Sequence, residues 1–324
     1  MVSGFLGRRV GQAIFTIAMI VVLNFVLFRL MPGSPERAAL RIPGISQEVY
    51  IATRARLGLD RPIFPDQLVS YIGATIRGDL GYSYKYRGQP VADVIGQRVW
   101  PTLILFGLGE ALAIAAGLAL GAYSGWRRGG PVDYLGNGLS LVLYSMPYFL
   151  LGMILLVIFA VALGWFPVSG MFTIGATFPS FVDKLADFGA HLVLPLATVS
   201  LGLIGQYSIL MRSSVIETLG EDYITTARAK GIIDRRILTR HAIPNAMLPT
   251  VSLIAINLGY LIAGAITVEV VFNWPGLGTL TVDALAARDY PVLQGIFLFL
   301  SVSVVLANLA ADVIYGYLDP RVRT

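Results

Sequence analysis

The chain has 324 residues, of which 56% are hydrophobic and only 13% are charged, whereas soluble domains are nearer a quarter charged. This composition excludes a soluble globular protein, and apolar runs of about 20 residues predict a helical protein that crosses the membrane several times. The absence of cysteine excludes disulfides and iron–sulfur clusters, and the net charge of +5 is more typical of basic cytoplasmic loops than of nucleic-acid binding.

The N-terminal third combines one apolar segment with a long polar one. Residues 10–30 form the first predicted span and follow Arg8 and Arg9. Because this apolar run is longer than that of a signal peptide, we expect residues 1–30 to form an uncleaved transmembrane helix. Residues 31–98 are polar and mixed in charge, which predicts a small subdomain outside the membrane.

Five further spans are predicted along the rest of the chain. Their approximate positions are 100–123, 134–164, 191–211, 248–272 and 291–317. Pro147 lies inside the third of these six spans and predicts a kink there. The connecting segments 166–190 and 273–290 are rich in turn residues and are predicted to be loops. Residues 99–318 thus form the membrane core, with a polar loop at 213–247, and residues 319–324 form a tail.

The distribution of lysine and arginine orients these spans. With the N-terminus inside, the short outside loops carry only Lys184 and Arg288, and the remaining short segments hold the basic clusters. Residues 31–98 hold nine basic residues on the outside, but segments longer than about 60 residues translocate largely regardless of charge. We therefore expect six spans in a bacterial plasma (inner) membrane, with both termini in the cytoplasm.

The motifs of an enzyme are absent. The sequence has neither GxxxxGK[ST] for nucleotide phosphates nor HExxH for zinc, and His191 and His241 are predicted on opposite sides of the membrane. No catalytic, cofactor or metal residue is therefore predicted. A few polar residues within the spans either bond to neighbouring helices or line a solute path. They are Glu110, Gln206, Tyr207 and Asn257.

The polar stretch 221–249 cannot lie in the bilayer, because charged residues at its centre cost about 2.5–3.5 kcal/mol each. Residues 221–230 are predicted to form a short helix that Gly231 ends, with Ala227 and Gly231 on one small face. A second short helix, 234–242, is expected to end at Pro244. The stretch is either a solvated charged loop or a projection on which another protein docks.

The motifs of this stretch resemble the cytoplasmic loop of the permeases of ATP-binding-cassette importers. Ala227, Gly231 and Pro244 match its spacing, while Thr225, Thr226 and His241 depart from the general pattern. The chain as a whole is similar to the B-type permease subunit of bacterial dipeptide and oligopeptide importers, within the binding-protein-dependent transport permease family. The further motifs are LGLDRP, GDLGYS, SMPYF, VEVVFNWPGLGTL, RDYPVLQG and DVIYGYLDPRVR.

The resemblance implies an all-α, type I importer permease fold with six transmembrane helices and an extracytoplasmic subdomain between the first two. It implies a transport subunit that forms half of a peptide pathway, and not an enzyme. The expected partners are a second permease, two ATPases that bind ATP and magnesium, and an extracytoplasmic peptide-binding protein. The residues expected to meet an ATPase are Asp222, Tyr223, Thr226, Ala227, Arg228, Ala229, Lys230 and Gly231.

Three other functions stay open at this point. The same family also imports nickel and glutathione, and the binding protein usually sets the specificity. A self-contained secondary carrier would need an internal repeat and ionisable residues at the middle of the membrane, and only Glu110 is such a residue. An intramembrane enzyme is disfavoured because no nucleophile–base or metal set is present.

Overall fold

The computed structural model describes residues 2–30, 51, 61–86, 89–260 and 266–318. Within these ranges the chain is mostly helical, and its only extended pairing is an isolated bridge between Tyr82 and Pro90. The predicted all-α class is therefore confirmed. The chain divides into two compact units, Met1–Trp100 with Gly276–Thr324, and Pro101–Pro275.

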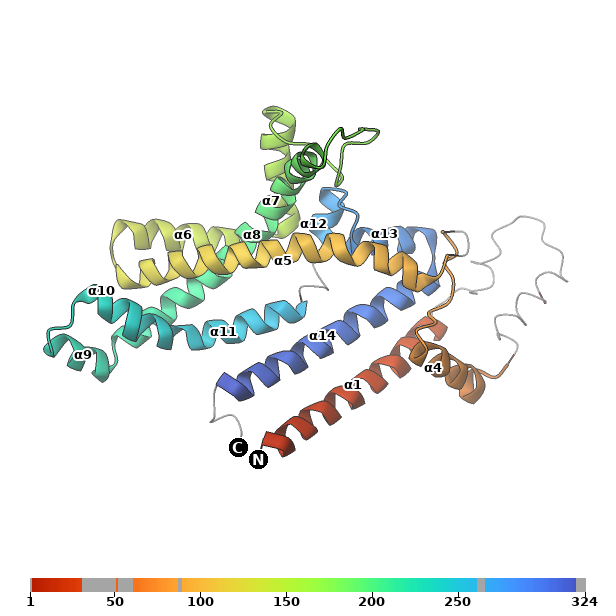
Figure 1. Cartoon of the computed structure of the whole chain (residues 1–324), viewed down its shortest axis with the longest axis horizontal. Coiled ribbons are helices and arrows are strands. Elements are labelled where there is room, and N and C mark those ends of the chain that lie inside the picture. Colours follow the sequence, from red (N-terminus) through yellow and green to blue (C-terminus); the bar gives the residue numbers. More distant parts are fainter. Residues whose placement is uncertain (1, 31–50, 52–60, 87–88, 261–265, 319–324) are drawn as a thin grey trace. The chain divides into compact units, whose positions relative to one another are not determined.

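The first unit contains two long helices, α1 (Val2–Leu30) and α14 (Tyr290–Leu318), which run side by side (Figure 1). The amide Nδ2 of Asn24 donates a hydrogen bond to the backbone oxygen of Gln294 at 3.0 Å. The ring centroids of Phe28 and Phe297 lie 5.8 Å apart. Apolar contacts, this hydrogen bond and an ion pair between Arg9 and Asp312 at 3.1 Å thus join the first and last long helices of the described chain.

A buried carboxylate organises the polar part of the same unit. Asp289 lies between α13 (Leu277–Ala287) and α14 and is 0% exposed. Its Oδ2 accepts hydrogen bonds from the Ser83 hydroxyl at 2.5 Å and from the Lys85 backbone N–H at 2.9 Å. Two shorter helical segments, η1 (Ile63–Gln67) and α4 (Leu68–Ile76), precede this segment. Of residues 31–60, the first part of the predicted subdomain 31–98, the structure describes only residue 51.

The second unit has α5 (Val91–Trp126, from Pro101 onward), α6 (Pro131–Ser145) and α8 (Phe181–Leu219) at its centre (Figure 1). Glycines four residues apart on α5 face α8. A Cβ at Gly117 would lie 2.6 Å from the Tyr207 Cβ, and one at Gly121 would lie 2.4 Å from the Ser208 backbone oxygen. Helices in lipid gain contact by such close approach, because lipid provides little hydrophobic drive for association.

The third predicted span was expected to be kinked at Pro147, but there it is broken into two helices. Helix α6 ends at Ser145, Met146 is extended with φ −83° and ψ 126°, and α7 (Tyr148–Leu155) continues into η2 (Leu156–Ala162). The two halves meet at 107°. Pro147 explains the break, because a residue before proline is disfavoured in the helical conformation.

Two predicted loops are partly helical. Helix α8 begins at Phe181, inside the predicted loop 166–190, because Ser180 caps it: the Ser180 Oγ accepts the Asp183 N–H, and the Asp183 carboxylate accepts the Ser180 N–H. Helix α13 lies inside the predicted loop 273–290, and the left-handed Arg288 (φ 54°) ends it. In both loops the helix begins two residues after the last proline of the segment, Pro179 or Pro275.

Four helices in the described ranges are long and apolar enough to cross a membrane, and a fifth span arises if α6 and α7 count as one. The predicted span 248–272 corresponds to α11 (Ile243–Tyr260) and α12 (Ile266–Val271), and residues 261–265 between them lie outside the described ranges. A total of six spans therefore stays a prediction.

Candidate coupling site

The polar stretch contains the predicted short helix. Helix α9 runs from Asp222 to Ala229, with an acid in its first turn and Arg228 in its last, as the helix dipole favours. Gly231 has φ +74°, its N–H donates to the Arg228 oxygen at 2.9 Å, and the Ile232 N–H donates to the Ala227 oxygen at 3.3 Å. These two bonds form a Schellman motif, so the predicted glycine cap is confirmed.

A small hydrophobic core holds α9 against the rest of the second unit. Ile224, Ala227 and Ile237 are buried together, at 0%, 6% and 0% exposure. Trp126 at the end of α5 and Leu219 at the end of α8 pack against them. The helix is therefore anchored to two long helices and not only tethered by its ends, which is what a rigid docking element requires.

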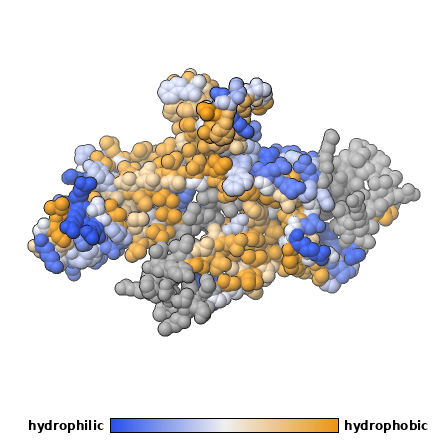
Figure 2. All heavy atoms as spheres, in the orientation of Figure 1, coloured by the Kyte–Doolittle hydropathy of each residue, from blue (hydrophilic) through white to orange (hydrophobic). Residues whose placement is uncertain are grey.

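The expectation that Ala227 and Gly231 share an open small face is wrong. The Ala227 side chain is 6% exposed and packs inside the loop's own core, while Gly231 is exposed. The other residues expected to meet a partner form the outer surface of α9 and of the turn that ends it, where hydrophilic residues gather beside the apolar surface of the long helices (Figure 2). They are Asp222, Tyr223, Thr226, Arg228, Ala229, Lys230 and Gly231.

Tyr223 is the one aromatic side chain on this outer surface, with 42% exposure. Partial burial, with a smaller contribution from the negative charge of Glu221, raises the pKa of its phenol above the ordinary value. Like any phenol, the group is protonated at neutral pH and can donate a hydrogen bond to a partner.

The second short helix does not end at Pro244. Helix α10 (Asp234–Ile237) runs through the π-helical turn η3 (Leu238–Ala242) directly into α11. A π turn before the proline relieves the backbone where proline lacks an N–H, so helix continues past it. Helix α10 is thus joined to α11 by unbroken helix, whereas α9 is joined to α8 by the two residues Gly220 and Glu221.

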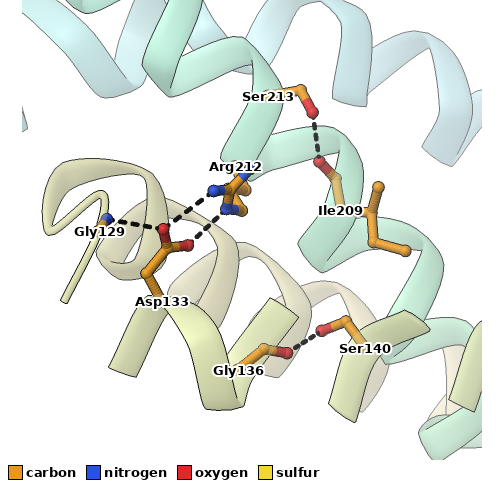
Figure 3. Close-up of polar contacts among 7 residues, drawn as sticks. All are labelled: Gly129, Asp133, Gly136, Ser140, Ile209, Arg212 and Ser213. Carbon is orange, nitrogen blue, oxygen red and sulfur yellow. Dashed lines mark hydrogen bonds and ion pairs between the residues drawn. The ribbon is translucent and has the colours of Figure 1, made fainter. Parts of the chain in front are cut away.

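An ion pair that the sequence analysis missed lies near this site (Figure 3). Asp133 is in the first turn of α6, and Arg212 is on α8, seven residues before its end at Leu219. Arg212 Nε donates to Asp133 Oδ1 at 2.5 Å, and Nη2 donates to Oδ2 at 2.9 Å. The available signal in the sequence was a lone acid two residues after Pro131 at a helix start, which reads equally as a simple helix cap.

The four polar residues singled out within the spans lie together in the second unit. The Tyr207 hydroxyl on α8 donates to the Glu110 carboxylate on α5, and Asn257 Nδ2 on α11 donates to the Tyr207 oxygen at 2.9 Å and to Gln206 Oε1 at 3.4 Å. Glu110 and Tyr207 are buried, at 4% and 0% exposure, whereas Gln206 and Asn257 are half-buried. The network therefore joins three helices and presents its amides outermost.

The known proteins that are similar to this chain are membrane components of transport systems. Residues 117–324 match the family model described as the binding-protein-dependent transport system inner membrane component. The dipeptide transport system permease protein DppB of Escherichia coli strain K12 is 39% identical over 338 residues, with 98% of each chain covered. The glutathione transport system permease protein GsiC of Salmonella paratyphi A is 38% identical, with 98% of this chain and 97% of that protein covered.

The fold has a solved counterpart. An inward-facing structure of the MetNI methionine ABC transporter matches 70% of this chain and 96% of the matched chain, with a TM-score of 0.56 and 17% sequence identity. The family match covers more than half of the chain, and the relatives align along nearly its whole length. The chain therefore belongs to the family of binding-protein-dependent transport system inner membrane components.

Proposed function

We propose that this chain is the transmembrane permease subunit of an ATP-driven importer of dipeptides or oligopeptides. The observation that carries the proposal is the 39% identity to a dipeptide transport system permease over 98% of both chains. A multi-pass inner-membrane subunit of this kind forms half of a pathway and pairs with a second permease. An extracytoplasmic binding protein delivers the peptide, and both termini of the chain lie in the cytoplasm.

Helix α9 is the proposed contact with a cytoplasmic ATPase. Its outer surface is exposed and polar, while Ile224 and Ala227 fix its inner surface to the ends of α5 and α8. An ATPase that binds and hydrolyses ATP with magnesium would move α9, and this rigid attachment would pass the movement to the long helices. Ala227 acts in this proposal by holding the helix in place and not by touching the partner.

The polar network in the second unit is the proposed border of the solute pathway. Gln206 and Asn257 are its half-buried members, so their amides are the groups that a passing peptide would meet first. Glu110 and Tyr207 are buried behind them and position Asn257. Amides suit this task, because they can donate to and accept from any peptide backbone.

The test is reconstitution of the importer. The chain is purified from membranes with the subunits that accompany it, placed in vesicles, and supplied with peptide, binding protein and ATP. The proposal predicts co-purification with an ATPase, ATP hydrolysis that peptide stimulates, and peptide accumulation that requires ATP. Uptake that follows a proton gradient without any ATPase would contradict it and would favour a self-contained carrier.

Glutathione is a second candidate cargo, because a glutathione transport permease is 38% identical to this chain over nearly its full length. Competition decides between the two: dipeptides, longer peptides and glutathione are offered together with one labelled substrate. The peptide proposal predicts that α-linked peptides displace the label at lower concentration than glutathione does. The reverse order would assign the chain to glutathione import.

A further inference from the structure

Asp133 receives three hydrogen bonds from two different parts of the second unit. The Gly129 backbone N–H in the turn between α5 and α6 donates to Oδ2 at 2.9 Å, and Arg212 on α8 donates through Nε and Nη2 (Figure 3). A simple helix cap would need only the first bond. The two-pronged bond to Arg212, which is 79 residues away in the sequence, joins this turn to α8.

Three helices, α5, α6 and α8, come together at this ion pair. The Asp133 side chain is 4% exposed and that of Arg212 is 23% exposed. The backbone of Arg212 also touches α5, since a Cβ at Gly125 would lie 2.8 Å from the Arg212 oxygen. Removing one member of a buried, hydrogen-bonded ion pair leaves the other charge uncompensated, so the pair holds one relative position of the two helices strongly.

The position of Arg212 relates the pair to α9. Helix α8 ends at Leu219, α9 begins at Asp222, and Leu219 and Trp126 both pack on the core beneath α9. The end of α8 and the end of α5 are thus attached to α9 by apolar contacts. The start of α6 makes its polar connection to α8 through Asp133 and Arg212.

We propose that Asp133 and Arg212 are positioning residues that make the turn between α5 and α6 move as one body with the end of α8 when α9 is displaced. The inference rests on the proposed function, because it assigns a role to the ion pair in passing on the ATPase movement. Without the pair, α9 and α8 would still respond to ATP, but α6 would follow incompletely. ATP would then be hydrolysed with less peptide transported.

The first measurement is the ratio of peptide molecules imported to ATP molecules hydrolysed by the reconstituted importer. Asp133→Asn and Arg212→Lys are each expected to lower this ratio by about tenfold, as expected for the loss of one charge-assisted contact. The double variant Asp133→Asn/Arg212→Gln leaves no unpaired charge, so it should assemble well and still show the low ratio. Arg127→Gln, an exposed arginine of the same turn, is the control and should keep the wild-type ratio.

The second measurement reads the movement directly. The chain has no cysteine, so cysteines at the exposed positions 134 and 217 can be spin-labelled specifically, with partner subunits freed of reactive cysteine. With the ion pair present, the distance between the labels should keep the same distribution with and without ATP. With Asp133→Asn, it should shift or broaden when ATP binds.

A wild-type uptake ratio in the double variant would overturn the proposal, since the pair would then only prevent an unpaired buried charge. An unchanged label distance in Asp133→Asn would overturn it as well. Failure of the wild-type importer to take up peptide would count against the proposed cargo alone, because the comparison of label distances between the wild type and Asp133→Asn needs ATP but no peptide.

Discussion

The phenol of Tyr207 on α8 donates a hydrogen bond to the buried carboxylate of Glu110 on α5. The same phenol oxygen accepts from Asn257 on α11 at 2.9 Å. One hydroxyl thus connects α5, α8 and α11 through two hydrogen bonds. Away from water, a hydroxyl whose hydrogen bonds are all made stabilises the fold and fixes the helices relative to one another.

Tyr207→Phe should therefore destabilise the purified complex more than Glu110→Gln. The first change removes the donor of Glu110 and the acceptor of Asn257 together, whereas glutamine can still accept from Tyr207. We expect a loss of about 1–3 kcal/mol for Tyr207→Phe, measured as a lower midpoint of thermal unfolding in detergent. Tyr134→Phe is the control, because that side chain is 73% exposed. Equal midpoints for Tyr207→Phe and Tyr134→Phe would contradict the network.

The close approach of α5 and α8 predicts opposite outcomes for two glycines of one helix. A Cβ at Gly121 would lie 2.4 Å from the Ser208 backbone oxygen, whereas a Cβ at Gly107 meets nothing within 4 Å. Gly121→Ala should cost about 1–3 kcal/mol through overpacking, while Gly107→Ala should be neutral or gain up to about 1 kcal/mol of helix propensity. The yield of folded protein on gel filtration and its unfolding midpoint check this. Equal tolerance of the two changes would show that α5 and α8 are not packed this closely.

Substitutions on the two sides of α9 should separate folding from docking. Ala227→Leu overfills the core beneath the helix and should lower the amount of folded permease. Ala229→Leu lies on the exposed side and should leave the isolated permease unchanged while weakening its binding to the ATPase. Circular dichroism and thermal unfolding report the first effect, and co-purification of the ATPase reports the second. An Ala229→Leu permease that binds the ATPase normally would remove this face of α9 from the docking surface.

Asp289 should stabilise the segment around Lys85 much more than Asp283 does. Asp289 is 0% exposed and accepts from Ser83 and from the Lys85 N–H, so Asp289→Asn should cost about 1–3 kcal/mol. Asp283 pairs with the Lys85 ammonium at 3.1 Å through a side chain that is 51% exposed, so Asp283→Asn should cost only about 0–1 kcal/mol. Hydrogen exchange of the Lys85 amide should accelerate markedly in the first variant alone. Similar rates in both variants would show that the buried carboxylate does not hold the segment.

The sequence by itself determined the membrane class, the helical content and the place of the polar stretch, because each depends on local composition. Charged residues cannot lie at the centre of a bilayer, and Gly231 is the residue type that ends a helix with a positive φ. The long helices α1, α5, α8 and α14 could be placed from their apolar runs. The ends of α14 were predicted to within one residue, whereas α8 extends beyond its predicted span at both ends and begins early because Ser180 caps it.

Tertiary structure alone decided which side chains meet. Spacing placed Ala227 on one small face with Gly231, but only the packing of Ile237 and Trp126 shows that Ala227 is turned inward, while Gly231 is exposed. In the sequence Asp133 is indistinguishable from an ordinary acid at a helix start, and only the fold places Arg212 beside it. The fold likewise joins Glu110, Gln206, Tyr207 and Asn257 into one network across three helices. Local sequence fixes what each helix can bury, whereas contacts between residues far apart in the chain depend on how the helices pack.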